Sequence, residues 1–387
     1  MNKHKRIFLD YASCTPVAPE VVSAMKPFLE GNFANPSALY AEAMVAKDAV
    51  LDARTRIAGV LNCQKTEIVF TASGTESNNL ALLGAFQAHR RPDFVPHIVT
   101  TTIEHPAILE VCEEIKVSGG EVTIVPVSED GVVSVIDIKN AIQENTVLVS
   151  VMYANNEIGT VQPIREIGKM IRDVRQKNNS SLPYFHTDAC QAGLYLSLDT
   201  LKLGVDMMTL DGIKMYGPRG MAMLYVRNGI ELHPLMHGGG QERGLRSGTE
   251  NVPGIVGLAK AIEIADEMRE SESARLIHIR DYAISEILKT FPNATLNGSG
   301  TERLPNNINI CFPGLDAEFA VISLDVAQIS TSYSSSCRTL SENSSSYVIS
   351  ALNKKNCSES SLRFTMGRET TRENINELIV ALQKIVR

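Results

Sequence analysis

The sequence predicts an α/β protein with a mostly parallel, seven-stranded sheet flanked by helices and a smaller α/β domain at the C-terminal end. Apolar, strand-like runs alternate with helical or loop stretches from about residue 61 to residue 226. The run Val-Leu-Val-Ser-Val-Met at 147–152 is nearly continuously apolar, as expected for a strand buried on both faces. After a glycine-rich segment at 237–248, the alternation gives way to a long helical pattern. A parallel sheet followed by a second, smaller unit accounts for all three observations.

The elements follow in order along the chain. The first forty residues are irregular and punctuated by proline and glycine, and a helix is expected at 41–61 because apolar residues recur there at helical spacing. The seven expected strands are 67–71, 97–101, 122–127, 147–152, 184–186, 206–210 and 221–226. In the C-terminal part we expect a helix at about 252–288, a strand at 307–311 and an amphipathic helix from about 372.

A serine-rich segment interrupts the C-terminal part. Residues 330–346 contain nine serines among seventeen residues, with Cys337 near the middle. Such a polar segment buries too little apolar surface to become rigid, so a mobile loop is expected there.

Composition narrows the class of protein. The 387 residues are 44% hydrophobic and 21% charged, which is typical of a soluble globular enzyme. The net charge of −7 argues against direct nucleic-acid binding. No apolar run is long enough to span a membrane, and the N-terminal residues do not form a secretory signal. Seven cysteines without CxxC spacing favour free thiols in a reducing cytoplasm over a disulfide framework.

A lysine and an aspartate follow two of the expected strands. Lys214 lies on a glycine-rich turn after 206–210, and Asp188 closes the strand that starts at 184. Ligands of open α/β sheets bind at such strand ends. Pyridoxal phosphate requires a lysine for covalent attachment and a carboxylate for its ring nitrogen. A solvated lysine, or an ion pair between strand ends, would explain the two residues equally well.

Three further polar clusters also follow apolar runs. Gly74 and Thr75 open a helix, where backbone amides can bind a phosphate, although an ordinary helix cap has the same composition. His105 and Asn156 end two other strands. Four such clusters at one edge of a sheet favour a ligand site over four separate structural roles.

Ten motifs along the chain resemble those of the cysteine desulfurases of the NifS and IscS type. These enzymes belong to the class V aminotransferase group of pyridoxal-phosphate enzymes with fold type I. The motifs are Leu-Asp-Tyr at 9, Asn-Pro-Ser at 35, Gly-Thr-Glu-Ser at 74, Glu-His at 104, Asn-Asn-Glu-Ile-Gly at 155, His-x-Asp-x-x-Gln at 186, Lys-x-Tyr-Gly-Pro-x-Gly at 214, the glycine-rich segment at 237–251, Ser-Ser-Cys at 335 and Leu-Arg-Phe-x-x-Gly-Arg at 362.

The resemblance implies a role for each cofactor-binding residue. Lys214 would attach the pyridoxal phosphate and move the substrate Cα proton, and Asp188 would hold the pyridinium. His105 would stack on the ring and shuttle protons. The remaining cofactor contacts would come from Asn156 and Gln191 near the ring oxygen, from Gly74 and Thr75 at the phosphate, and from Thr249 of a second subunit, which implies a homodimer.

The resemblance also implies the reaction. Arg363 would bind the carboxylate of L-cysteine, with Asn156 beside it, and a bidentate guanidinium suits that task. Cys337 would attack the substrate sulfur, release L-alanine and carry a persulfide to a sulfur-acceptor protein. The pathways expected are iron–sulfur cluster assembly, tRNA thiolation and DNA sulfur modification. The alternatives are a lyase for selenocysteine or another β-substituted amino acid, and a cofactor-poor pseudoenzyme that serves as a sulfur-relay scaffold.

Two substitutions at the expected phosphate site set this chain apart from the family. Members usually have serine and histidine, which help bind the phosphate, where this chain has Asp211 and Ile213. A carboxylate about 4 Å from a phosphate charge would cost roughly 4 kcal/mol at an effective dielectric constant of 20. Asp211 therefore turns away, is compensated by a nearby cation, or weakens cofactor binding.

The same resemblance divides the chain into three parts. Residues 1–20 are expected to join the small domain, residues 21–255 to form the large cofactor-binding domain, and residues 256–387 to form the small C-terminal domain with the loop of Cys337.

Overall fold

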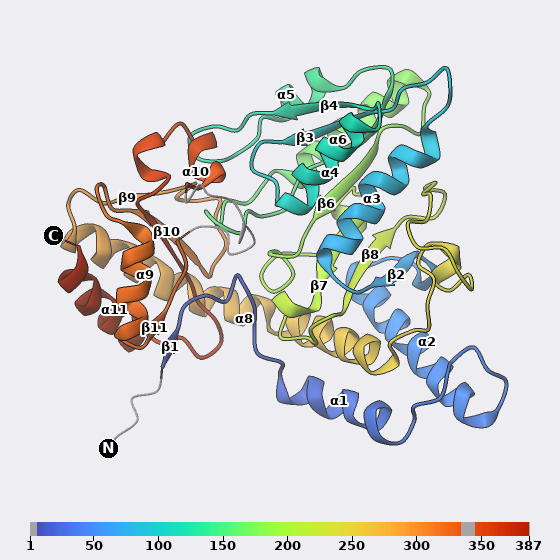
Figure 1. The fold of residues 1–387 in the computed structure, drawn as a ribbon, viewed down its shortest axis with the longest axis horizontal. Helices are drawn as coiled ribbons and strands as arrows, with labels where there is room; N and C mark the ends of the chain where they lie inside the picture. Colours follow the sequence, from blue (N-terminus) through green and yellow to red (C-terminus); the bar gives the residue numbers. More distant parts are fainter. Residues whose placement is uncertain (1–5, 334–344, 387) are drawn as a thin grey trace.

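Seven strands form the central sheet of the computed structural model, which describes residues 6–333 and 345–386 (Figure 1). In spatial order they are β2 (Ile68–Thr71), β8 (Ala222–Val226), β7 (Met207–Asp211), β6 (Tyr184–Asp188), β5 (Thr146–Ser150), β3 (His97–Thr101) and β4 (Glu121–Val125). All neighbouring pairs are parallel except those made by β8, which runs antiparallel to β2 and β7. The predicted fold class is confirmed.

Helices cover both faces of the sheet because neighbouring strand residues point to opposite sides. In β2, Val69 packs into the cluster under one set of helices and Phe70 into the cluster under the other. The first set is α3 (Gly74–His89) and α4 (Pro106–Val117), and the second is α2 (Ala41–Leu61), α5 (Val135–Ala141), α6 (Ile164–Asn178) and the N-terminal part of α8. Two further helices complete this part, α1 (Pro19–Glu30) and α7 (Thr200–Leu203).

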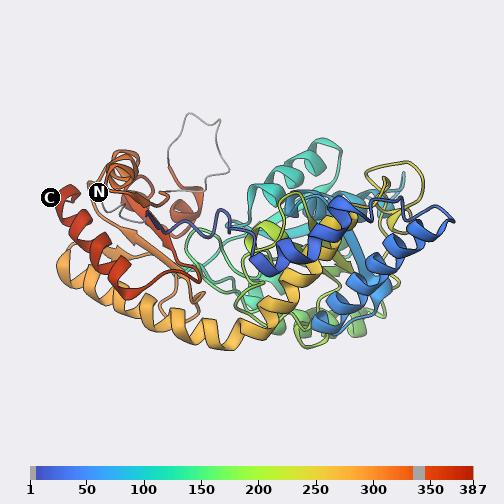
Figure 2. The same cartoon turned by 90° about the horizontal axis from the view of Figure 1, so that it is seen from below.

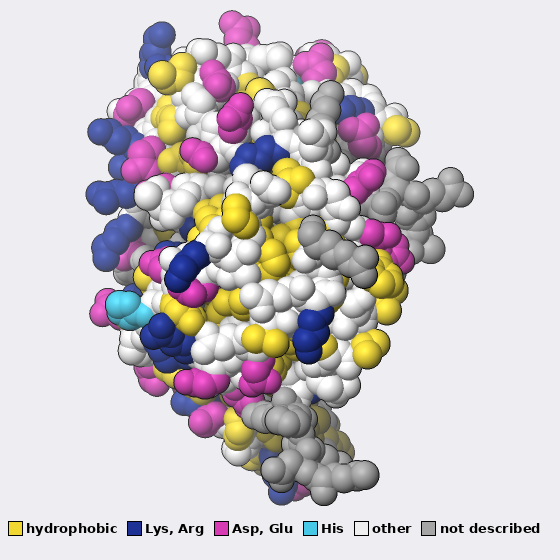
Figure 3. Space-filling view, turned by 90° about the vertical axis from the view of Figure 1, so that its left-hand side faces the viewer, with side chains coloured by type: hydrophobic (Ala, Val, Ile, Leu, Met, Phe, Trp, Pro, Cys, Tyr) yellow, Lys and Arg dark blue, Asp and Glu magenta, His cyan; other side chains and the backbone are white. Residues whose placement is uncertain are grey.

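The C-terminal part has its own small sheets and core. Antiparallel β12 (Ser361–Thr365), β10 (Asn307–Cys311) and β9 (Thr295–Leu296) form one sheet, and β1 (Ile7–Phe8) pairs in parallel with β11 (Ile329–Ser330). Its helices are α9 (Ala317–Val326), α10 (Tyr347–Ala351) and α11 (Arg372–Ile385). On α9, Phe319, Ile322 and Val326 remain exposed, and Figure 3 shows hydrophobic side chains among charged ones on this side of the molecule.

Helix α8 (Val252–Thr290) connects the two parts as one continuous element of 39 residues (Figure 2). Most of its buried apolar residues up to Ala265 belong to the core of the large part, and the buried apolar residues from Leu276 onward belong to the C-terminal core. The expected boundary at 255/256 therefore falls inside a helix, and the three-part division of the chain stays a prediction.

Several expected elements match the structure closely, among them the helix at 41–61 and the strands at 97–101 and 307–311. The strand expected at 147–152 is Thr146–Ser150 instead, although the backbone amide of Val151 still donates to the carbonyl oxygen of His186 in β6, at 3.1 Å. Of the serine-rich segment, Ser330 belongs to β11 and Ser346 caps α10, whereas residues 334–344 lie outside the described residues.

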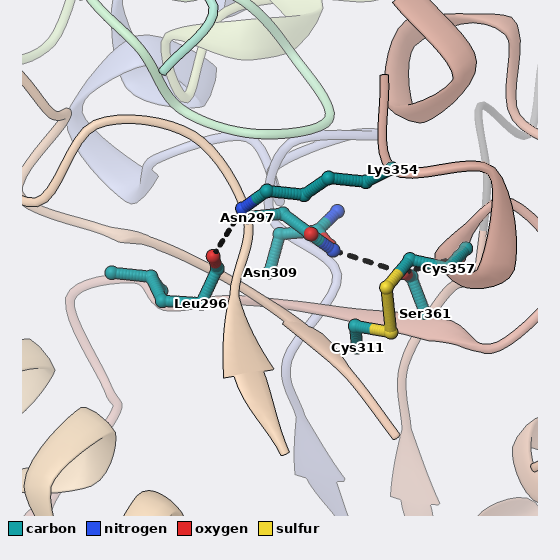
Figure 4. The surroundings of a disulfide bond; sticks show 7 residues. All are labelled: Leu296, Asn297, Asn309, Cys311, Lys354, Cys357 and Ser361. Atoms are coloured by element: carbon teal, nitrogen blue, oxygen red, sulfur yellow. Dashed lines mark hydrogen bonds between the residues drawn. A yellow bond between two sulfur atoms is a disulfide. The ribbon is translucent and has the colours of Figure 1, made fainter. Parts of the chain in front are cut away.

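One expectation about cysteine was wrong. Cys311 in β10 and Cys357 are joined by a disulfide, with Cα atoms 5.3 Å apart (Figure 4). Their sequence separation of 46 gives no spacing motif, and they meet because Cys357 precedes β12, which pairs with β10. Cys14, Cys63, Cys112 and Cys190 are free thiols, and Cys337 lies outside the described residues.

The disulfide predicts a thiol count. When the denatured, non-reduced protein is alkylated, five of its seven cysteines should react, and all seven should react after reduction. Intact-mass spectrometry reads the number of added groups, and a Cys311→Ser variant should release the thiol of Cys357. Seven alkylated cysteines without any reductant would contradict the bond.

Within the described ranges, no helix combines the length and the apolarity needed to span a membrane.

Candidate active site

A cavity of about 340 Å³ opens at the edge of the sheet where the parallel strands end. Asp188 is the last residue of β6 and Asp211 the last of β7, while Gly74 begins α3 directly after β2. Of the twelve site residues expected from the sequence, the structure brings ten into the wall of this cavity. They are Gly74, Thr75, His105, Asn156, Asp188, Gln191, Asp211, Ile213, Lys214 and Arg363.

Two expected residues are not among the lining residues. Thr249 is exposed and lies outside the cavity of its own chain. Cys337 falls in the range that the structure does not describe.

Lys214 ends a 3-10 turn (η2, Gly212–Lys214) that begins immediately after β7. Its amine donates hydrogen bonds to the carbonyl oxygens of Ala12, at 2.9 Å, and of Ser13. The irregular N-terminal segment thus holds the amine at the cavity wall.

Asp188 is buried, and its carboxylate is held by two neutral donors. Its Oδ2 accepts from the side-chain amide of Asn78 at 2.7 Å, and its Oδ1 accepts from the backbone amide of Cys190 at 3.0 Å. Burial lowers the pKa of His186, two residues earlier, to about 4, so that ring is neutral at physiological pH. A fixed carboxylate with neutral hydrogen-bond partners can stabilise a cationic nitrogen in the cavity.

Arg363 extends from β12 into the same cavity. Its Nη2 pairs with Oδ1 of Asp10 at 2.7 Å, and its Nη1 donates to the backbone oxygen of Asn156 at 2.9 Å. Among the described residues, no partner is present for the buried Arg363 Nε or for the buried Asn156 Oδ1. Buried polar atoms are normally hydrogen-bonded, so these two atoms in the cavity wall indicate a polar ligand.

His105 caps the N-terminus of α4. Its Nδ1 accepts from the backbone amide of Ala107 at 3.1 Å, which requires an unprotonated Nδ1. In the neutral ring the proton is therefore on Nε2, where it can be donated to a ligand.

Asp211 does not turn away from the position expected for the phosphate. Its Oδ2 accepts from the backbone amide of Gly74 at 2.8 Å, and its Oδ1 accepts from that of Ile213 at 3.1 Å. The first of the three outcomes expected for Asp211 is thereby excluded, since the carboxylate lies at the N-terminus of α3.

The cavity also contains six residues that we did not select from the sequence: Ala12, Ser13, Asn78, Met152, Ala154 and Cys190. Asn78 and Cys190 could have been selected from the sequence, because each lies in a polar run close to a residue that was selected. No sequence pattern pointed to Ala12 and Ser13, because only the tertiary fold brings them to the site.

Glu104 lies directly behind the site and is fully buried. Its Oε1 accepts from Thr101 Oγ1 at 2.7 Å and from the backbone amide of Met152 at 2.9 Å. Burial raises the pKa of Glu104 to about 8, so it folds as the neutral acid at neutral pH.

This pKa predicts how Glu104→Gln changes stability with pH. Between pH 4.5 and about 8 the folded carboxyl keeps its proton and the unfolded one loses it, so folding takes up a proton and wild-type stability falls as pH rises. Glutamine cannot ionise. The free energy of unfolding of the variant, relative to that of the wild type, should therefore rise by on the order of 4 kcal/mol between pH 5 and pH 9. Denaturant unfolding at the two pH values measures the gain, with the exposed Glu114→Gln as control. A stability difference independent of pH would contradict the prediction.

A lysine and an aspartate that meet at the strand ends of a seven-stranded, mostly parallel sheet are the arrangement of a fold-type-I pyridoxal-phosphate enzyme. The chain belongs to the class-V aminotransferase family, whose model matches residues 7–378. It is 41% identical over 384 residues to a protein named cysteine desulfurase IscS from Dictyoglomus turgidum, covering 99% of this chain and 95% of the relative.

Two solved structures are also similar to this chain in fold and in sequence. A NifS-like protein is similar with a TM-score of 0.90 and 31% identity, covering 98% of this chain and 99% of the other. The structure described as SspA in complex with cysteine has a TM-score of 0.79 and 35% identity, covering 93% of this chain and 98% of that one.

The cavity fits the aldehyde and the ring of pyridoxal phosphate but not its phosphate group. Lys214 offers the amine and Asp188 offers a carboxylate for the ring nitrogen. Oδ1 of Asn156, which has no partner within the described ranges, can accept from a polar group. The phosphate end differs, because Asp211 has placed a carboxylate on the amide of Gly74. The described residues contain no cluster of three or more His, Cys, Asp or Glu side chains that could hold a metal ion.

Proposed function

We propose that the chain is a pyridoxal-phosphate-dependent cysteine desulfurase. It removes the sulfur of L-cysteine, releases L-alanine and holds the sulfur as a persulfide for a sulfur-acceptor protein. The observation that carries this proposal is the meeting of Lys214, Asp188 and Arg363 in one cavity. The name of the Dictyoglomus relative and the cysteine bound in the SspA structure support it.

The bound cofactor supplies an electron sink for bonds at the substrate Cα. Asp188 keeps the ring nitrogen protonated, because its buried carboxylate is fixed by Asn78 and the backbone. Lys214 takes the proton from the substrate Cα with the amine that the carbonyls of Ala12 and Ser13 hold at the wall. His105 donates from Nε2, since its Nδ1 already accepts a backbone hydrogen bond.

Arg363 binds the substrate carboxylate. Asp10 and the backbone oxygen of Asn156 orient its guanidinium, and its Nε remains available among the described residues. A planar guanidinium with several donors fixes both the position and the orientation of a carboxylate.

Cys337 acts as the nucleophile. Its thiolate attacks the substrate sulfur, a sulfur–sulfur bond forms as the Cβ–S bond breaks, and the electron pair stays on Cβ, which takes up a proton. Ser332 exchanges backbone hydrogen bonds with Arg363, at 2.7 and 3.3 Å. Cys337 follows Ser332 by five positions in the sequence, and five residues of extended chain span at most about 18 Å.

Ser346, which follows the undescribed range 334–344, is also hydrogen-bonded close to the cavity wall. Ser346 Oγ donates to Glu157 Oε2 at 2.6 Å, next in sequence to Asn156. Both attachments support delivery of Cys337 to the cavity rather than a remote role for its thiol.

The enzyme functions as a homodimer in this proposal, with Thr249 completing the partner's cofactor site. Thr249 is exposed, as that role requires. Six large apolar side chains are also exposed within residues 29–45, and a surface of this kind is typical of an interface. They are Leu29, Phe33, Leu39, Tyr40, Met44 and Val45. The cytoplasm as the compartment, and the pathway of the acceptor, remain predictions.

The test is cysteine-dependent formation of alanine. The cofactor-loaded protein should form one alanine per transferred sulfur and should carry a persulfide when no acceptor is present. A protein that releases sulfide from cysteine without a persulfide intermediate, or that accepts selenocysteine alone, would favour the lyase. Retention of Lys214, Asp188 and Arg363 in one cavity argues against the cofactor-poor scaffold.

A further inference from the structure

Asp211 occupies the part of the cavity that would receive the cofactor phosphate. Its Oδ2 is 2.8 Å from the backbone nitrogen of Gly74, the first residue of α3. A Cβ atom at Gly74 would lie 3.3 Å from that oxygen and 2.8 Å from Cys190 Sγ, so the two chain segments are in close contact. The carboxylate thus uses a donor at the helix N-terminus, where anions bind through backbone amides.

Among the residues that the structure describes, Lys214 and Arg246 are already engaged by groups other than Asp211. The Lys214 amine is engaged by two backbone carbonyls, and Arg246 on the glycine-rich segment pairs with Glu76 at 2.8 Å. Asp188 adds a second carboxylate to the same cavity. Burial, as the largest cause, raises the pKa of Asp211 above its ordinary value, and its backbone hydrogen bonds and the charge of Lys214 only partly oppose this shift.

We propose that Asp211 selects between the phosphorylated and the unphosphorylated B6 aldehyde and shifts the preference of this chain toward pyridoxal. The inference rests on the proposed function, because it assumes a B6 aldehyde in this cavity. A phosphate must share the N-terminus of α3 with the carboxylate, which repels it. The hydroxymethyl group of pyridoxal instead donates a hydrogen bond to that carboxylate. Ile213 contributes to the same preference, since it offers the phosphate no side-chain donor.

The test compares two affinities in each of several variants. Apoprotein is titrated with pyridoxal phosphate and, separately, with pyridoxal, and the visible absorbance of the bound aldehyde gives both dissociation constants. The ratio of the two constants is then compared between proteins, because this cancels any cyclisation of free pyridoxal. Asp211→Asn and Asp211→Ser should each shift the ratio toward pyridoxal phosphate by at least about tenfold, since repulsion between unit charges at contact exceeds the free energy of a tenfold change.

Asp199→Asn is the matched control. Asp199 also caps a short helix, accepting from the backbone amide of Lys202 at 3.0 Å, but it lies outside the cavity. This variant should leave the ratio unchanged, and thermal unfolding shows that all variants are folded. A ratio unchanged in the folded variants Asp211→Asn and Asp211→Ser overturns the proposal.

Alanine formation separates this inference from the proposed function. A shifted ratio without alanine from cysteine supports the role of Asp211 and refutes the desulfurase. An unshifted ratio together with alanine formation refutes the role of Asp211 and supports the desulfurase. If no variant binds either aldehyde, both the role of Asp211 and the desulfurase function are refuted.

Discussion

Replacement of Lys214 by alanine should lower alanine formation from L-cysteine by at least about a thousandfold, which is the scale of a lost general acid–base group. The expected loss follows from position. The side chain enters the cavity from η2, directly behind β7, and its amine shares the cavity with the buried carboxylate of Asp188. Removing the amine takes away both the covalent attachment of the cofactor and the group that moves the Cα proton.

Two measurements check this result. Amino-acid analysis quantifies alanine, and visible absorbance after gel filtration reports attached cofactor. Lys214→Arg, which keeps the charge but cannot form the attachment, should fail as completely as Lys214→Ala. Lys202→Ala, whose side chain is exposed on α7, should behave as the wild type. Stable visible absorbance together with wild-type turnover in Lys214→Ala would remove the basis of the proposed function.

The second large effect concerns Cys337. Cys337→Ser should lower turnover by at least about a hundredfold and leave cofactor absorbance intact, because an unactivated hydroxyl does not replace a thiolate as nucleophile. Mass spectrometry of the protein after a single incubation with cysteine should find one added sulfur in the wild type and none in the variant.

Cys190 is the competing nucleophile, because it lies in the cavity wall. Burial and the neighbouring charge of Asp188 raise its pKa well above the ordinary value, so its thiol stays protonated and unreactive. Cys190→Ala should therefore still acquire the added sulfur, and Cys63→Ser, outside the cavity, should retain full turnover. An added sulfur that persists in Cys337→Ser and disappears in Cys190→Ala would show that Cys190, and not Cys337, is the nucleophile.

Local patterns were sufficient for the fold and for much of the site. The helix at 41–61 was predictable because its buried residues recur at helical spacing, and the strand at 97–101 because it is a short run that is buried throughout. Lys214 and Asp188 were predictable as a pair because parallel strands end at one edge of the sheet. The roles assigned to the site residues stay predictions, since they were carried over from a resemblance.

The remaining features depend on contacts between distant parts of the chain. Nothing near Asp10 shows that it pairs with Arg363, and nothing near Cys311 shows that it bonds to Cys357. The sequence singled out Asp211 as an unusual residue, but its direction was open. Only the approach of β7 to the N-terminus of α3 determines that the carboxylate meets the amide of Gly74.

The N-terminal segment has a consequence for biosynthesis. Asp10 pairs with a residue 353 positions downstream, and the carbonyls of Ala12 and Ser13 hold the amine of Lys214. During synthesis, the candidate active site therefore cannot be complete until Arg363 has emerged from the ribosome.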